Sequence, residues 1–242
     1  MYQLPLTLET PAANLALDEA LLDAAVEGEL PGEVVRLWEP ADFFVVLGRS
    51  SALGEVHEQS CRADGVPLLR RSSGGATIVA GPGCLMYAVV LDLDERPELR
   101  HVDRAHRFVL GRTAAALAPL AAGIALAGTS DLTIPAASSP GAAPRKFSGN
   151  SLRLKRHRLL YHGTILYDFP LARLGRWLDA PARTPTYRGE RGHEAFVANL
   201  PASREALTAA LIEAWQATEH MATWPQARTA ALAAGRYASP SW

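Results

Sequence analysis

The apolar run CLMYAVVLDL at residues 84–93 is the feature that most restricts how this chain folds. Its residues do not alternate between apolar and polar types, as they do in a strand with one face in water. A strand in the middle of a covered sheet has apolar residues on both faces. We therefore predict that residues 84–93 form a strand at the centre of a sheet.

The remaining patterns predict helices and strands around this one. Apolar residues at helical spacing predict helices over 11–27, with Asn14 as a cap near the start, and over 103–122. Further predicted elements are strands at 33–40, 42–49, 66–71 and 158–168, and helices at 56–65, 170–180 and 203–219. We expect a tight connection between the strands at 33–40 and 42–49, and Ser203 as the cap of the last helix. Because the order lacks regular βαβ spacing, the sequence predicts an α+β fold with a mixed, largely antiparallel sheet flanked by helices.

Length and charge narrow the possible functions. We expect residues 1–242 to form one domain without a further accessory domain, because no linker with a second core behind it is visible. Lys and Arg number 24 against 25 Asp and Glu, so the net charge of −1 gives no overall field for nucleic acid or an anionic membrane. No apolar stretch reaches the ~20 residues of a spanning helix, and Met1 is not followed by a secretory signal. With two cysteines and no CxxC motif, the sequence predicts a cytoplasmic protein.

Residues 70–77, with the sequence RRSSGGAT, are a candidate anion site. Paired glycines let successive backbone N–H groups point at one anion, and a neighbouring arginine adds a planar fork of donors. The alternative is an ordinary turn between strands with two solvated arginines. The segment fits neither the GxxxxGK[ST] nor the GxGxxG pattern.

Three other segments carry charged residues with two interpretations each. In RKFSGN (145–150), Lys146 precedes a Ser-Gly turn and either directs its ammonium at an anion or is a surface lysine. Asp131 in GTSDL either binds a cation such as Mg²⁺ or caps a turn. In PTYRGERGHEAF (185–196), the basic residues either contact a nucleotide or an acidic partner, or form a solvated loop; they are Arg188, Arg191 and His193.

The segment PAASSPGAAP at 135–144 has the composition of a loop. It joins Asp131 to Lys146. We expect it to be weakly ordered without ligand and to close over a bound one.

Four segments follow one another in a family-specific order: RRSSGGATIV at 70–79, GTSDLTI at 128–134, RKFSGNSLR at 145–153 and LLYHGTILYDFPL at 159–171. Together they resemble the lipoate–protein ligase A family, whose catalytic domain belongs to the biotin and lipoate ligase superfamily. The resemblance covers roughly residues 10–200. It implies the class II synthetase and biotin-ligase-like version of the α+β fold.

The resemblance also implies roles for individual residues. An RR-x-x-GGG loop in that family surrounds the acyl group and the phosphate, and the lysine of a K-x-SG motif contacts the activated carbonyl. Lys146 is then the catalytic residue. The implied acyl-adenylate site consists of Arg70, Arg71, Ser73, Gly74, Gly75, Ala76, Asp131, Ser148, Gly149, His162 and Gly163. Ala76 replaces the family's third glycine and Ala80 its usual histidine, although Ala76 keeps its N–H donor.

The implied reaction needs ATP, Mg²⁺ and lipoate or octanoate, with Asp131 as the candidate ligand of Mg²⁺. A carboxylate attacks the α-phosphorus of ATP to give an acyl-AMP, and a lysine of an acceptor protein then attacks the anhydride. The implied partners are lipoyl-acceptor domains, such as that of a 2-oxoacid dehydrogenase E2 or the glycine cleavage H protein. An accessory subunit on a second polypeptide is a further implied partner.

Three alternatives stay open at this point. An octanoyl or lipoyl transferase of the same superfamily uses a cysteine thioester and no ATP. This chain has no cysteine beyond Cys84, which opens the predicted central strand and is interpreted as structural. A non-catalytic lipoate-binding subunit is the second alternative, against which Lys146 and Asp131 argue. Biotin as substrate is the third, although the GRGRxGR-type loop of the biotin branch is absent.

Overall fold

The computed structural model of the chain describes residues 1–136, 141–179 and 184–239. Part of the predicted loop over 135–144, residues 137–140, lies outside these ranges. The strands are β1 (Tyr2–Leu4), β2 (Val34–Trp38), β3 (Phe44–Leu47), β4 (Leu68–Arg70), β5 (Ile78–Ala80), β6 (Cys84–Asp92), β7 (Ala125–Ala127), β8 (Asp131–Ile134), β9 (Arg145–Lys155), β10 (Arg158–Leu166) and β11 (Glu219–His220). The helices are α1 (Pro11–Val26), α2 (Glu58–Ala63), α3 (Val102–Leu117), α4 (Leu174–Trp177), α5 (His193–Phe196), α6 (Arg204–Ala214) and α7 (Gln226–Ala234).

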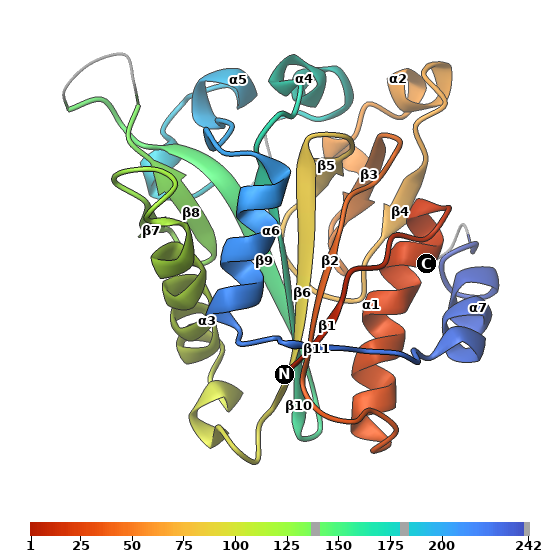
Figure 1. Cartoon of the computed structure of the whole chain (residues 1–242). Coiled ribbons are helices and arrows are strands. Elements are labelled where there is room, and N and C mark those ends of the chain that lie inside the picture. The colour runs from red at the N-terminus through yellow and green to blue at the C-terminus, as the bar shows by residue number, and fades with distance from the viewer. Residues whose placement is uncertain (137–140, 180–183, 240–242) are drawn as a thin grey trace.

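The main sheet has the strand order β11-β1-β2-β6-β10-β9-β8-β7 (Figure 1). Every neighbouring pair from β2 to β7 in this order is antiparallel, whereas β1 pairs in parallel with β2 and β11. The largely antiparallel α+β fold that the sequence predicts is therefore confirmed. β6 has β2 on one side and β10 on the other, which confirms the central position of the apolar run.

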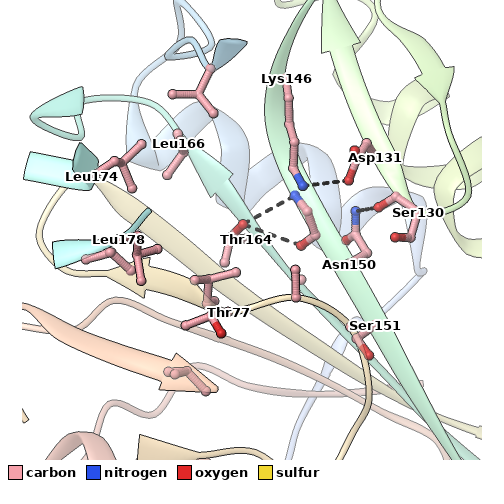
Figure 2. Close-up of a pocket in the computed structure, with 18 of the residues that line it drawn as sticks. Thr77, Ser130, Asp131, Lys146, Asn150, Ser151, Thr164, Leu166, Leu174 and Leu178 are labelled. Carbon is pink, nitrogen blue, oxygen red and sulfur yellow. Dashed lines mark hydrogen bonds and ion pairs between the residues drawn. The ribbon is translucent and has the colours of Figure 1, made fainter. Parts of the chain in front are cut away.

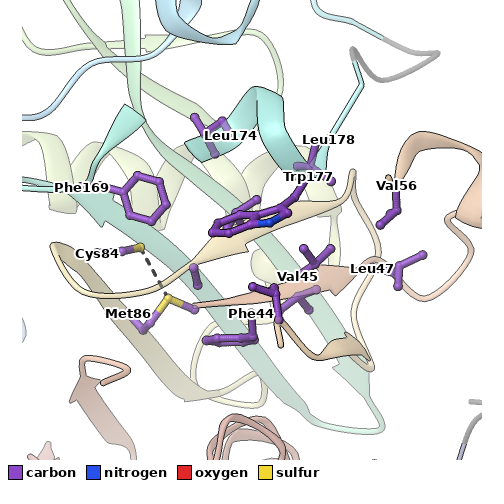
Figure 3. Packing of buried hydrophobic residues seen from close by; sticks show 14 of the residues in the cluster. Phe44, Val45, Leu47, Val56, Cys84, Met86, Phe169, Leu174, Trp177 and Leu178 are labelled. Carbon is purple, nitrogen blue, oxygen red and sulfur yellow. Dashed lines mark hydrogen bonds between the residues drawn. The ribbon is translucent and has the colours of Figure 1, made fainter. Parts of the chain in front are cut away.

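β6 is apolar on both faces because both faces are covered (Figure 1). Its odd-numbered residues from Leu85 to Leu91 share a core cluster with buried residues of α3 and α6. On the opposite face, Ala88 and Val90 pack against α1. Cys84 and Met86 lie on that same face, in a third cluster with β3 and α4 (Figure 3). Two different layers thus share this second face of the strand.

The second layer on that face is a separate small sheet with the order β4-β3-β5. β3 pairs in parallel with β4 and antiparallel with β5. The predicted tight connection between two paired strands is wrong, because β2 and β3 belong to different sheets. The partners of β3 come from positions 68–70 and 78–80, so the short chain link to β2 does not decide its pairing. Figure 3 shows the small sheet packed through Phe44 and Val45 near Trp177 of α4.

Two local predictions are also corrected. Asn14 does not cap α1, because Pro11 occupies the first turn and Thr10 becomes the cap, accepting from the N–H of Ala13 at 3.2 Å. Asn14 is buried instead and accepts a hydrogen bond from Arg36 at 2.5 Å. The Ser-Gly turn predicted at 145–150 is part of β9, which runs straight through it. Ser203 does cap α6, as predicted.

The helices over 103–122, 170–180 and 203–219 are shorter than predicted. α3 and α6 end at Leu117 and Ala214, and the middle segment holds only a 3₁₀ turn followed by the single turn of α4. Among the described residues, no helix combines the length and apolar character needed to cross a membrane.

The C-terminal helix α7 lies beside α1 (Figure 1), and the carboxylate of Glu19 on α1 joins the two. Glu19 is 1% exposed and accepts hydrogen bonds from Arg153 at 2.6 Å, from Tyr237 at 2.9 Å and from Arg236. One buried carboxylate therefore connects α1, β9 and the residues after α7.

We predict that Glu19→Gln lowers the free energy of unfolding by about 2–3 kcal/mol, since it removes the anion from buried and half-buried cations. This loss of stability is smaller than is usual when a fully buried ion pair is broken, because Arg153 and Arg236 are partly exposed. Urea denaturation measures the change. Glu29→Gln is the matched control: its pair with Arg228 is on the surface, and its loss is expected to change stability by less than about 0.5 kcal/mol. Equal effects of the two substitutions would contradict the prediction.

A second prediction concerns pH. His106 on α3 is buried and lies 2.9 Å from the hydroxyl of Tyr161. Burial lowers its pKa from the ordinary value, and the charges of Asp103 and Asp131 only partly oppose this effect. The unfolded chain therefore binds a proton at this histidine at higher pH than the folded chain does. Stability is retained above about pH 6.5 and falls as the pH drops below it, at up to about 1.4 kcal/mol per pH unit. His106→Gln is expected to flatten this dependence between pH 7.5 and 5.5, and an unchanged slope would exclude the explanation.

Candidate active site

A cavity of about 430 Å³ lies between the small sheet, the strands β9 and β10 and the segment 184–197. Its two sides differ in chemistry (Figure 2). Leu166, Leu174 and Leu178 line one side. Lys146 and Asp131 lie on the other, with further polar groups beside them. The cavity therefore suits a ligand that has an apolar chain joined to a charged group.

Arg71 organises the loop that borders this cavity. Its guanidinium is 7% exposed and donates to the carbonyl of Gly74 at 2.5 Å and to that of Ala76 at 2.9 Å. Burial lowers the pKa of Arg71 to about 10, so it remains charged at neutral pH. Ser151 adds a hydrogen bond to the Gly74 carbonyl at 2.8 Å, and Ser51 one to the Gly75 carbonyl at 3.1 Å. The loop carbonyls are thus held by the protein's own donors.

The backbone N–H groups of the same loop are unused. Those of Gly74, Gly75 and Ala76 donate to no acceptor within the part of the chain that the structure describes. Gly75 and Ala76 line the cavity, and Gly75 has a φ of +88°, a conformation that favours glycine. Consecutive free N–H groups of this kind form a nest for an anion. The alternative of a turn with two solvated arginines does not fit the buried Arg71, and the anion site stays a prediction.

Lys146 reaches the cavity from β9 and forms an ion pair with Asp131 on β8, with 2.7 Å between Nζ and Oδ1 (Figure 2). Tyr187 donates to the other oxygen of Asp131 at 2.7 Å. Burial, followed by the charge of Asp131, raises the pKa of Tyr187, so its hydroxyl stays a donor. The lysine is therefore positioned by a carboxylate that is itself fixed on both oxygens.

Glycines make room for these polar side chains. A Cβ on Gly149 would lie 2.8 Å from Nζ of Lys146, so the lysine lies against the bare backbone of its own strand. A Cβ on Gly163 would lie 1.8 Å from Oδ1 of Asn150. Asn150 uses that oxygen to accept from Tyr87 at 2.5 Å and donates to the carbonyl of Ser130 at 2.9 Å. Both glycines are therefore required by close approaches.

His162 joins β10 to the loop. Its Nε2 lies 2.5 Å from Oγ of Ser73, and its Nδ1 lies 3.7 Å from the carboxylate of Asp18, which is paired with Arg36 at 2.5 Å. The order serine, histidine, aspartate resembles a nucleophile with its base and acid. Ser73 is 1% exposed and does not line the cavity, so the arrangement holds the loop in place rather than presenting a nucleophile.

The structure brings most of the predicted site residues to one cavity. Those that line it are Arg71, Gly75, Ala76, Asp131, Lys146, Gly149, His162 and Gly163. Four others do not line it: Arg70, Ser73, Gly74 and Ser148. Arg70 donates to the carbonyls of Gly48 and Ser51, both at 2.8 Å, and so holds the turn that faces the loop. Ser148 is buried and accepts from Asn150 at 3.0 Å.

Sequence reasoning missed several lining residues. Asn150 stands in the quoted motif RKFSGN but was not singled out, and neither were Asp18, Tyr87 and Thr164. The sequence around Tyr187 does not indicate that it belongs to the site, because its hydrogen-bond partner Asp131 lies 56 positions away. Arg188 was singled out with two interpretations, and the solvated loop does not fit it, because it is 4% exposed and lines the cavity.

The donors present do not form a protein-held Mg²⁺ site. The described residues contain no group of three or more acidic, histidine or cysteine side chains placed to hold a metal. Both oxygens of Asp131 already have partners.

Neither cysteine lines the cavity. Both are buried, and burial raises the pKa of each thiol.

The fold and the shape of the cavity suit a domain for a ligand with an apolar chain that ends in an anion. A family model for the lipoyl protein ligase A/B catalytic domain matches residues 10–218, and the chain belongs to this family. A putative lipoate-protein ligase A of Aeropyrum pernix is 31% identical over 209 residues, covering 86% of this chain and 72% of the relative. The resemblance inferred from the four motifs is confirmed, and with it the class of enzyme, the lipoate–protein ligases.

Solved structures share the fold at lower identity. A bi-partite lipoate protein ligase of Thermoplasma acidophilum, described together with its E2 lipoyl domain, has a TM-score of 0.82 at 20% identity, covering 100% of this chain and 94% of its own. A lipoate-protein ligase A bound with ATP has a TM-score of 0.79 at 20% identity, covering 100% and 97%. A putative lipoate protein ligase of T. acidophilum with bound lipoic acid has a TM-score of 0.75 at 19% identity, with the same coverage.

We predict that Gly149→Ala slows the reaction of this site about tenfold, equivalent to about 1.4 kcal/mol. The added methyl group displaces Nζ of Lys146, the flexible end of a side chain, so the fold is expected to survive. Turnover and the thermal midpoint measure the two effects separately. Gly111→Ala on α3 is the control, since a Cβ there meets nothing within 4 Å. Unchanged turnover in Gly149→Ala would show that the lysine position is not critical.

Proposed function

We propose that this chain activates lipoate or octanoate with ATP to an acyl-AMP and transfers the acyl group to a lysine of an acceptor protein. The observation that carries the proposal is the cavity in which an apolar wall meets a row of unused loop N–H groups and Lys146. The names of the relatives and the ATP-bound and lipoic acid-bound neighbours of similar fold support the same chemistry.

In the first step, the carboxylate of the acid attacks the α-phosphorus of ATP and pyrophosphate leaves. Negative charge increases on the phosphoryl oxygens as the new bond forms. The N–H groups of Gly75 and Ala76, which line the cavity, together with the ammonium of Lys146, are donors fixed in advance for that charge. Donors that need no rearrangement stabilise a transition state more than a ground state.

In the second step, the ε-amine of the acceptor lysine attacks the carbonyl of the anhydride and AMP leaves. The same donors then stabilise the oxyanion of the tetrahedral intermediate. We propose a lipoyl domain as acceptor, such as that of a 2-oxoacid dehydrogenase E2 or the glycine cleavage H protein. The structural neighbour described with its E2 lipoyl domain supports this class of partner, and its bi-partite composition supports an accessory subunit.

We include Mg²⁺ only as an ion brought by the nucleotide phosphates. Mg²⁺ is commonly bound by one or two carboxylates plus substrate phosphates, and Asp131 is the carboxylate that lines the cavity next to Lys146. No step of the proposed reaction is assigned to this ion.

A thioester transferase is the second candidate considered. It needs a reactive thiolate in the site, whereas Cys61 and Cys84 are both buried outside the cavity. Cys84 contacts Met86 within the apolar cluster of Figure 3, at 3.7 Å between sulfur atoms. A non-catalytic subunit would have no use for free N–H groups beside a positioned lysine.

Pyrophosphate release from ATP, measured with lipoate, octanoate and biotin offered separately, tests the proposal. Release that depends on lipoate or octanoate supports an acyl-adenylating enzyme. Transfer to the acceptor from an acyl thioester in the absence of ATP would support the transferase instead.

We predict that Lys146→Ala lowers the rate of acyl-AMP formation by about 10²–10³-fold and leaves the fold intact. Loss of one charge-stabilising donor raises a barrier by about 3–4 kcal/mol. Near-native pyrophosphate release by this variant would show that the lysine is not catalytic.

Cys84→Ser is the paired control for that prediction. The ligase interpretation expects this variant to keep its activity after a modest loss of stability, because the thiol is buried outside the cavity. A thioester mechanism expects complete loss.

A further inference from the structure

Arg188 is a buried guanidinium whose hydrogen bonds are incomplete. It ends the 3₁₀ turn Thr186–Arg188, is 4% exposed and lines the cavity. Its Nε donates to the carbonyl of Arg191 at 2.9 Å, and its Cζ lies 4.8 Å from the centre of the Phe196 ring. Its Nη2 is buried and has no partner among the described residues. A donor of this kind is expected to have a partner that the protein itself does not supply.

The charge of Arg188 is also unbalanced. Arg191 lies over the same ring at 5.4 Å, and Arg145 donates to the carbonyl of Glu194 at 2.6 Å on the same helix. None of these three arginines forms an ion pair within the described ranges. Burial lowers the pKa of Arg188, and the neighbouring charge of Arg191 adds to that effect. Buried charges are normally paired or bound to a ligand of opposite charge.

The other cations of the cavity region already have partners within the protein. Arg71 donates to loop carbonyls, Lys146 is paired with Asp131, and Arg36 behind the wall is paired with Asp18. Arg188 therefore combines an unpaired charge with an unused donor at the cavity wall.

Arg188 lies at the opposite end of the cavity from the loop nest. β9 borders the cavity from Lys146 to Ser151, a length of about 17 Å at about 3.4 Å per residue. Ser151 contacts the nest through Gly74, whereas the carbonyl of Lys146 accepts from the N–H of Ala198, just after α5 and Phe196. Two anion sites separated in this way, with the ammonium of Lys146 reaching along β9 as far as Gly149, suit a ligand that carries more than one anionic group.

We propose that Arg188 binds a phosphoryl group of the nucleotide, a contact distinct from the nest and from Lys146. The inference rests on the proposed function for the identity of the nucleotide, although a phosphate site at Arg188 can be tested without any turnover. The bound oxygens would receive the unused Nη2 donor and balance the buried charge.

Isothermal titration of ATP, AMP, inorganic pyrophosphate and lipoate into the full chain tests this inference. Arg188→Gln removes the charge and keeps a polar, although shorter, side chain. We expect it to weaken ATP binding at least tenfold and to leave lipoate binding unchanged, with part of the ATP affinity restored in Arg188→Lys. Loss of AMP affinity would place the α-phosphate at Arg188, and loss of pyrophosphate affinity alone would place the terminal phosphates there.

The matched control is Arg112→Gln, because Arg112 also lies over an aromatic ring, 4.9 Å from that of Trp215, and does not line the cavity. It is expected to bind all four ligands as the wild type does. Wild-type affinity of Arg188→Gln for ATP, AMP and pyrophosphate would overturn the inference. An equal loss of lipoate affinity in Arg188→Gln would also overturn the inference, since it would show that Arg188 has a structural role in the cavity.

The outcomes separate this inference from the proposed function. If lipoate-dependent pyrophosphate release occurs but Arg188→Gln binds ATP normally, only the role of Arg188 fails. If wild type binds pyrophosphate through Arg188 but forms no acyl-AMP, the site stands and the ligase proposal fails.

Discussion

The site depends on one buried guanidinium acting within its own loop. Arg71 fixes the carbonyls of Gly74 and Ala76, so the peptide groups between them have their oxygens engaged and their N–H groups unused. Gly74, Gly75 and Ala76 are exposed, so these N–H groups are accessible to a ligand while the bonds to the loop carbonyls hold its geometry. This arginine thus holds the loop carbonyls and leaves the loop N–H groups available to a ligand.

The position of that loop follows from how the two sheets meet. The loop connects β4 to β5, both strands of the small sheet, whereas the lysine and its carboxylate partner come from β9 and β8 of the main sheet. β6 carries the small sheet on one end of one face and α1 on the other end. The cavity is the space between these layers, which explains its apolar wall and its single polar side.

The sequence was sufficient to predict the family, the α+β class and the central strand, since each depends on a long run or on several ordered motifs. It predicted strands at 42–49 and 66–71, which contain β3 and β4, but not β5 or the pairing of the three strands in a separate sheet, because pairing between strands has no local signal. It placed a turn at 145–150 because Ser-Gly usually breaks a strand, whereas here Gly149 makes room for Lys146. Contacts between distant residues, such as Ser73 with His162, have no local signal in one sequence.

Some of the cations around the cavity are paired with a carboxylate and others are not. Asp131 neutralises Lys146 and Asp18 neutralises Arg36, while Arg71 and Arg188 have no carboxylate partner among the described residues. The lining also includes the carboxylates of Glu55 and Asp179, so Arg71 and Arg188 are distinguished by this lack of a carboxylate partner in a mostly apolar space, where electrostatic interactions are stronger than in water. An apolar acid joined to a nucleotide phosphate complements both properties at once, whereas a neutral apolar ligand would leave the two guanidinium charges unbalanced.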